Sequence, residues 1–89
     1  MEPTAKPRLP RGVRLRRDEV RQRWTLLAPE RIFEVDDTAA AVLELCDGER
    51  DLAVIVAELA ARYNAPAAVI EKDVVAMLSD LKAKRVLET

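Results

Sequence analysis

Apolar and polar residues alternate along residues 13–27, and this pattern predicts a short β-hairpin. Val13 and Leu15 fall on one face of the first arm, while Trp24 and Leu26 share one face of the second arm. A period of two is typical of strands, and a hairpin this short cannot bury its apolar face alone. The segments that follow are therefore expected to cover that face.

A third strand is expected over Arg31–Val35, where Ile32, Phe33 and Val35 are apolar. Pro29 separates it from the hairpin, because proline cannot donate to a strand ladder and favours a turn. Residues 18–19 are expected to form the first turn in the same way. We place Phe33 and Val35 on the core face, and the order of the segments puts this strand at the edge of the sheet.

Three helices are predicted after the strands, from capping residues and apolar spacing. The first begins at Asp36–Thr38 and stops at Gly48, the second runs from Asp51 to Asn64, and the third from Pro66 to about Lys84. Val86 and Leu87 form a short apolar tail that is expected to fold back onto the body. The sequence thus predicts an α+β fold, with a three-stranded antiparallel sheet followed by three helices in a winged-helix-turn-helix-like arrangement.

The length of 89 residues fits one domain. Residues 1–9 are rich in proline and polar side chains and are expected to be a disordered tail, with the domain spanning residues 10–89. No apolar stretch resembles a signal peptide or a membrane span, so we expect a cytoplasmic protein without a membrane partner.

The residues needed for most enzyme chemistry are scarce. The chain has no histidine, one cysteine and two glycines, which argues against the commonest general base, a metal site and a glycine-rich phosphate loop. Cys46 lies on the apolar face of the first predicted helix, where a buried thiol is inert. We therefore expect no enzyme activity, no metal and no cofactor.

Charge is divided unevenly between the two parts of the chain. Residues 1–31 carry nine Lys or Arg against four acids, and residues 32–89 carry six against twelve. A helix-turn-helix with a basic hairpin raises a small winged-helix DNA-binding protein as the alternative function. The third predicted helix is neutral, however, with Glu71, Asp73 and Asp80 against Lys72, Lys82 and Lys84. No nucleic-acid partner is therefore expected.

An edge strand beside an apolar helix is typical of peptide binding. The unpaired N–H and C=O groups of such a strand accept an extended peptide as an additional strand. Apolar side chains of that peptide would enter the groove between the third strand and the third helix. Val69, Val74 and Met77 are candidates for this groove, although each residue alone also fits ordinary core packing.

The chain resembles the PqqD family of pyrroloquinoline quinone (PQQ) biosynthesis from about Pro10 to Leu87. The matching segments are RLRRDEVRQRWTLLAPERIFEVDDTAAAVLELCDGER, residues 14–50, and AVIVAELAARY, residues 53–63. The strand with Trp24, the Pro29-Glu30 pair and the run Leu45–Gly48 occur in this order and together are specific.

This resemblance implies a peptide chaperone, a RiPP recognition element that holds the precursor peptide PqqA. It would present PqqA to PqqE, a radical S-adenosylmethionine (SAM) enzyme that joins a Glu and a Tyr side chain of the precursor. Related recognition elements bind the peptide antiparallel to the third strand, against the third helix. Carried over to this chain, the resemblance implies a peptide-binding site made of Arg31, Ile32, Phe33, Glu34 and Val35 on the strand, and Val69, Ile70, Asp73, Val74 and Met77 on the helix.

Overall fold

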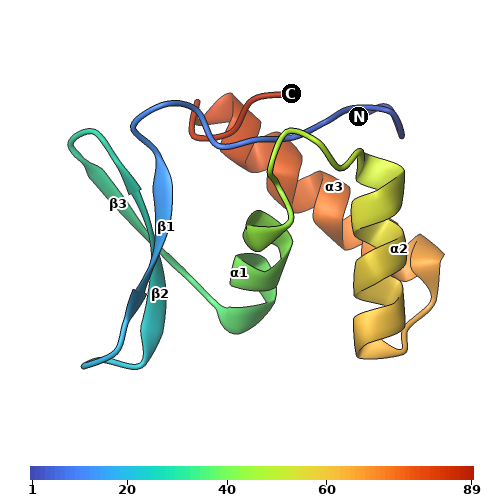
Figure 1. The fold of residues 1–89 in the computed structure, drawn as a ribbon, viewed down its shortest axis with the longest axis horizontal. Helices are drawn as coiled ribbons and strands as arrows, with labels where there is room; N and C mark the ends of the chain where they lie inside the picture. The colour runs from blue at the N-terminus through green and yellow to red at the C-terminus, as the bar shows by residue number, and fades with distance from the viewer.

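The computed structural model describes all residues 1–89 and contains three strands followed by three helices (Figure 1). The elements are β1 (Arg14–Asp18), β2 (Arg23–Ala28), β3 (Arg31–Val35), α1 (Asp37–Glu44), α2 (Leu52–Tyr63) and α3 (Ala67–Ala83). The predicted α+β architecture is confirmed. Figure 1 shows the sheet on one side of the molecule, with the helices together on the other.

The sheet is antiparallel throughout, in the order β1-β2-β3. Leu26 of the central strand lies opposite Leu15 on β1 and Phe33 on β3, so these three apolar side chains form one row. Leu26 is 0% exposed, which shows that this row faces the helices. The predicted division of the strands into a core face and an outer face is confirmed.

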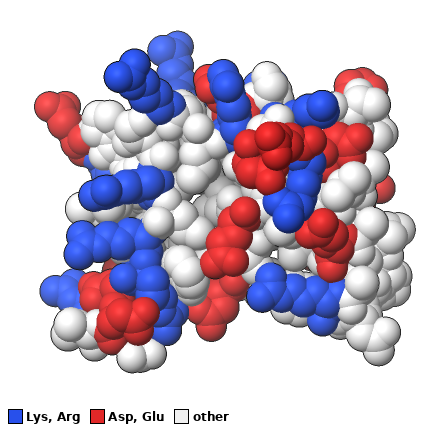
Figure 2. Space-filling view, in the orientation of Figure 1, with Lys and Arg blue, Asp and Glu red and all other residues white.

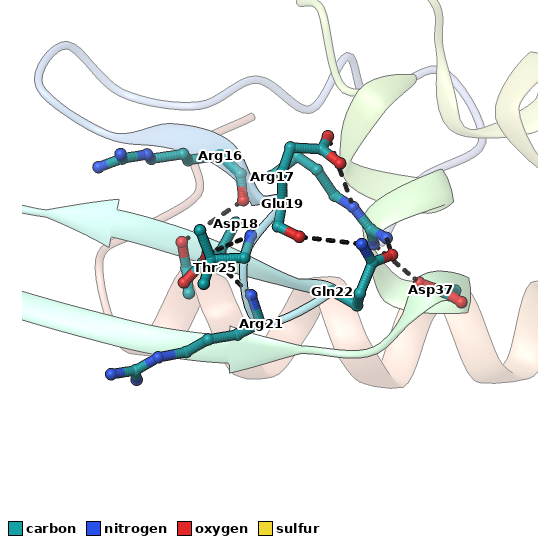
Figure 3. Close-up of polar contacts among 9 residues, drawn as sticks. Arg16, Arg17, Asp18, Glu19, Arg21, Gln22, Thr25 and Asp37 are labelled. Carbon is teal, nitrogen blue, oxygen red and sulfur yellow. Dashed lines mark hydrogen bonds and ion pairs between the residues drawn. The ribbon is translucent and has the colours of Figure 1, made fainter.

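The turn between β1 and β2 comprises residues 19–22 and is longer than the predicted turn at residues 18–19. Asp18 organises it, because its Oδ1 accepts from the N–H groups of Val20 at 3.1 Å and Arg21 at 3.2 Å. Arg17 donates to Gln22 at 3.0 Å and lies 3.7 Å from a carboxylate oxygen of Asp37 (Figure 3). The tip of the hairpin is thereby connected to the start of α1.

The helices pack around one apolar core. α1 contacts all three strands, and α2 and α3 pack against each other. The most buried large side chains include one from the sheet, several from the helices and one from the C-terminal tail: Leu26, Leu52, Ile55, Leu59, Leu78 and Val86. The prediction that Val86 and Leu87 fold back is confirmed, since they are 0% and 2% exposed.

Capping residues set the helix ends. Asp36 and Asp51 each accept from a backbone N–H of the following helix, at 2.7 and 2.9 Å, and Asn64 ends α2 with φ 49°. The prediction that α1 continues to Gly48 is wrong, because the helix ends at Glu44. Gly48 is still left-handed, with φ +79°, but it lies in the following loop, where a Cβ would come within 3.3 Å of Arg8.

The N-terminal segment differs from the predicted disordered tail of residues 1–9. Arg8 exchanges backbone hydrogen bonds with Glu88, at 2.8 and 3.0 Å. Leu52 N–H donates to Ala5 C=O and Ala53 N–H to Pro3 C=O, at 2.8 and 3.0 Å. A proline-rich segment lacks donors but keeps its carbonyls, so it can satisfy the free N–H groups at the start of α2.

None of the helices is both long enough and apolar enough to cross a membrane.

Candidate functional site

The free edge of β3 is the first part of the site. β3 pairs only with β2, and a two-residue turn at Pro29–Glu30 connects them. In an antiparallel pair, hydrogen-bonded and non-hydrogen-bonded positions alternate, and the residues that flank a two-residue turn are hydrogen-bonded. Arg31, Phe33 and Val35 therefore bond to β2, while the N–H and C=O groups of Ile32 and Glu34 point away from the sheet.

The core face of β3 packs against the C-terminal end of α3. The Arg31 guanidinium donates to the carbonyl of Lys84 at 2.8 Å and lies 5.6 Å from the centre of the Phe33 ring. The Lys84 Nζ lies 6.0 Å from the centre of the same ring. These contacts connect the start of β3 to the end of α3, with two cationic groups near the Phe33 ring.

An apolar cavity of about 100 Å³ lies among the three helices. Its lining comes from every helix and contains six apolar residues and two polar ones: Thr38, Val42, Leu59, Tyr63, Ile70, Asp73, Val74 and Met77. Thr38 is three residues beyond the end of β3, so the cavity lies near the end of that strand. Its size is suited to a single apolar side chain.

The structure brings four of the five helix residues implied by the resemblance into this cavity, namely Ile70, Asp73, Val74 and Met77. Val69 is not among the lining residues, and 53% of its surface is exposed. Val74 is only 4% exposed, so most of its side chain belongs to the core.

The five strand residues divide between the two faces of the sheet. Arg31, Phe33 and Val35 lie on the core face, and Arg31 and Phe33 contact Lys84 at the end of α3. Ile32, at 71% exposed, and Glu34 lie on the outer face, and Glu34 accepts from Arg23 at 2.7 Å. Ile32 and Glu34 therefore contribute their backbone edge to the site, whereas the other three contribute side chains.

Sequence reasoning missed the part of the cavity that α1 and α2 provide, namely Thr38, Val42, Leu59 and Tyr63. It also missed Lys84, which contacts both Arg31 and Phe33. The apolar stripe of residues 52–63 was visible in the sequence, but a stripe does not indicate which neighbour each residue meets.

Cys46 lies outside this site. It is 5% exposed, and its thiol donates to the Val42 carbonyl at 3.3 Å. Burial, together with the negative charge of Asp47, raises the pKa of the thiol to about 12. The predicted burial of Cys46 is confirmed. No group of three or more His, Cys, Asp or Glu residues is arranged to hold a metal ion.

Comparison with known proteins gives the same assignment by sequence and by structure. The profile of the family described as coenzyme PQQ synthesis protein D (PqqD) matches residues 23–87. A protein of Rhodopseudomonas palustris strain TIE-1, named PqqA binding protein, is 56% identical over 81 residues, which cover 91% of this chain and 79% of that protein. The bifunctional coenzyme PQQ synthesis protein C/D of Methylorubrum extorquens is 54% identical over 92 residues, which cover 98% of this chain and 25% of that protein.

Two solved structures share the fold. The solution structure of the PqqD truncation of Methylobacterium extorquens PqqCD, described as a functional and stand-alone RiPP recognition element, superposes with a TM-score of 0.82 at 54% identity. That match covers 100% of both chains. The crystal structure of PqqD from Xanthomonas campestris gives a TM-score of 0.64 at 43% identity, covering 100% of this chain and 99% of that one.

Proposed function

The chain belongs to the PqqD family, and from this premise we propose that it binds the peptide PqqA as a fourth strand along β3. Its relatives carry the name PqqA binding protein. Strand addition needs an unpaired edge for the backbone and pockets for alternate side chains. The observation that carries the proposal is the free edge at Ile32 and Glu34, together with an apolar cavity that Thr38, three residues beyond β3, helps to line.

The two faces of an added strand would meet different surroundings. Peptide residues on the same face as Phe33 would point toward α3 and the cavity. Residues on the other face would lie beside Ile32 and Glu34, over the exposed outer side of the sheet. Affinity would then come from backbone pairing and from one or two apolar anchors, which leaves the rest of the peptide free.

We further propose that the bound peptide is presented to the radical SAM enzyme PqqE for Glu–Tyr cross-linking, as the family resemblance implies. Binding through one short segment supports this role, because reacting side chains elsewhere in the peptide stay accessible to the enzyme. The chain itself would then supply position and not chemistry. The cytoplasmic location expected from the sequence stays a prediction.

The experiment that tests the proposal is a titration of ¹⁵N-labelled protein with PqqA, combined with two substitutions of one residue. Ile32→Pro removes an N–H that points away from β2, so no bond within the sheet is lost, and proline is tolerated on edge strands. We expect a folded protein whose PqqA affinity falls by about 1–3 kcal/mol, since one hydrogen bond is lost and a peptide carbonyl is left unpaired.

Ile32→Ala is the matched control, because it removes the exposed side chain and keeps the N–H. Affinity should stay within about 0.5 kcal/mol of the native value, as for most surface changes. Phe33→Pro, in contrast, removes a bond to β2 and should unfold the edge. A folded Ile32→Pro protein with native affinity would exclude strand addition at β3, and unshifted amides throughout the titration would exclude PqqA binding itself.

A further inference from the structure

The groove proposed for the peptide, along the free edge of β3 and beside α3, is acidic at its Val35 end. Asp73 is exposed on the wall of the cavity, beside Thr38 of α1, and its carboxylate forms no ion pair or hydrogen bond. The residues that lead from β3 into α1 are Asp36 and Asp37, and the Asp37 side chain is 90% exposed. Asp37 has only a distant partner, Arg17 at 3.7 Å. Carboxylates therefore outnumber cationic groups among these residues near the end of β3.

The opposite end of the groove is basic. Arg31 is exposed and donates to a neutral carbonyl, so its positive charge has no carboxylate partner. Lys84 pairs with Asp80 at 2.8 Å, which cancels that charge locally. Arg85 follows, exposed and without an ion pair. The start of β3 and the end of α3 thus leave a net positive charge.

The two ends are far enough apart to contact different residues of one extended peptide. Asp73 precedes Lys84 by eleven residues, which is about 16 Å of helix axis. An extended chain rises about 3.4 Å per residue. Side chains of one peptide that meet Asp73 and Arg31 would therefore be about four or about six residues apart, because only an even spacing puts both on the same face of an extended strand.

The pairing direction decides which charge belongs at which end of the guest. The sheet is wholly antiparallel, and antiparallel pairing is the slightly more stable kind per residue. In a peptide that runs antiparallel to β3, the N-terminal residues lie beside Val35, at the end near Asp73, and the C-terminal residues lie beside Arg31. Its N-terminal part would face the acidic end, and its C-terminal part the basic end.

We propose that this groove selects a charge-polarised peptide segment, with a basic residue on the N-terminal side of an apolar anchor and an acidic residue on the C-terminal side. Asp73 and Arg31 are the residues that determine this preference. The inference rests on the proposed peptide binding at β3 and adds the chemical class of the segment bound. Complementary charges at the rim also favour one orientation of the guest over the reverse.

The test neutralises one charge at a time and measures PqqA affinity at low and high salt. Asp73→Asn and Arg31→Gln should each weaken binding about two- to fivefold at low ionic strength, as for exposed ion pairs. Their salt dependence should be shallower than that of the native protein, because each has one fewer ionic contact to screen. If either residue had a purely structural role, its substitution would leave the salt dependence of PqqA binding unchanged.

Two other charges serve as matched controls. Glu71 lies on the same helix as Asp73 but on a different face, against Pro3 and Ala53, and Arg14 lies on the outer face of β1, without an ion pair. Glu71→Gln and Arg14→Gln should leave both affinity and salt dependence unchanged. The inference is overturned if Asp73→Asn and Arg31→Gln behave like these controls.

Direction is measured with a nitroxide attached to either end of PqqA. An N-terminal label should broaden the amides of Asp37 and Thr38 more than those of Arg31 and Lys84, and a C-terminal label should do the reverse. The opposite order, or equal broadening, contradicts the inference although PqqA still binds. Absence of any PqqA binding to the native protein would instead refute the proposed function, and the charge preference with it.

Discussion

Cys46 shows how one buried side chain makes the stability of the protein depend on pH. Its thiol has an ordinary pKa of 9.0, which rises to about 12 in the folded protein. Between these values the unfolded chain loses a proton that the folded chain keeps. The stabilising contribution is therefore complete below pH 9 and decreases as the pH rises toward 12.

We predict that the free energy of unfolding falls above pH 9, by at most about 1.4 kcal/mol per pH unit from this group. Urea unfolding of the native protein and of Cys46→Ala at pH 8 and pH 10.5 measures the effect. The substitution removes the thiol, so the difference in stability between the two proteins should shrink at the higher pH. An equal difference at both values would contradict the raised pKa.

At the scale of elements, the N-terminal segment is part of the fold. It places Arg8 beside both the α1–α2 loop and the C-terminal tail, and Pro7 is fully buried. Gly48 N–H donates to the Pro7 carbonyl at 3.0 Å. The segment thus connects parts of the chain that are distant in sequence and also caps α2.

Removal of residues 1–8 should therefore destabilise the domain, by about 1–3 kcal/mol, because several backbone hydrogen bonds outweigh the entropy regained by the segment. Urea denaturation measures the loss. Removal of residues 1–2 alone is the control, since it spares the carbonyls of Pro3, Ala5 and Pro7, and it should cost less than about 0.5 kcal/mol. Equal stability of the two shortened chains would show that the segment contributes nothing.

The sequence patterns predicted the helices and strands well, because periodicity and capping act locally. The alternation around Leu26 and the side-chain caps at Asp36 and Asp51 act within a few residues, and all were predicted. The cavity depends on helix packing angles, and no local signal places Leu59 and Tyr63 opposite α3. The sequence also did not predict that the N-terminal segment is ordered, because its hydrogen bonds reach residues more than forty positions away.

For the whole molecule, the basic side chains gather on one side. Figure 2 shows Lys and Arg atoms concentrated where Figure 1 places the sheet. Four arginines of the hairpin lie around its outer face: Arg14, Arg16, Arg21 and Arg23. Arg23 is neutralised by Glu34. The remaining positive charge lies on the hairpin and not on the helix that a helix-turn-helix protein inserts into the major groove.

We accordingly predict negligible DNA binding at physiological salt, because three unpaired arginines offer few phosphate contacts and α3 carries three acidic residues against two lysines. A mobility-shift titration with random duplex DNA, performed at low and physiological salt, measures this. Weak binding at low salt that disappears at physiological salt fits the charge distribution. Micromolar affinity at physiological salt would instead support the winged-helix alternative.

The alternation of bonded and free groups along β3 also has a kinetic consequence. Amide protons of Arg31, Phe33 and Val35 should exchange slowly with deuterated solvent, whereas those of Ile32 and Glu34 should exchange fast. An added strand would slow only the second set, so the pattern along β3 would change from alternating to uniform protection. A peptide bound through side chains alone would leave the alternation intact. Exchange at the amides of Ile32 and Glu34 therefore distinguishes strand addition from binding through side chains.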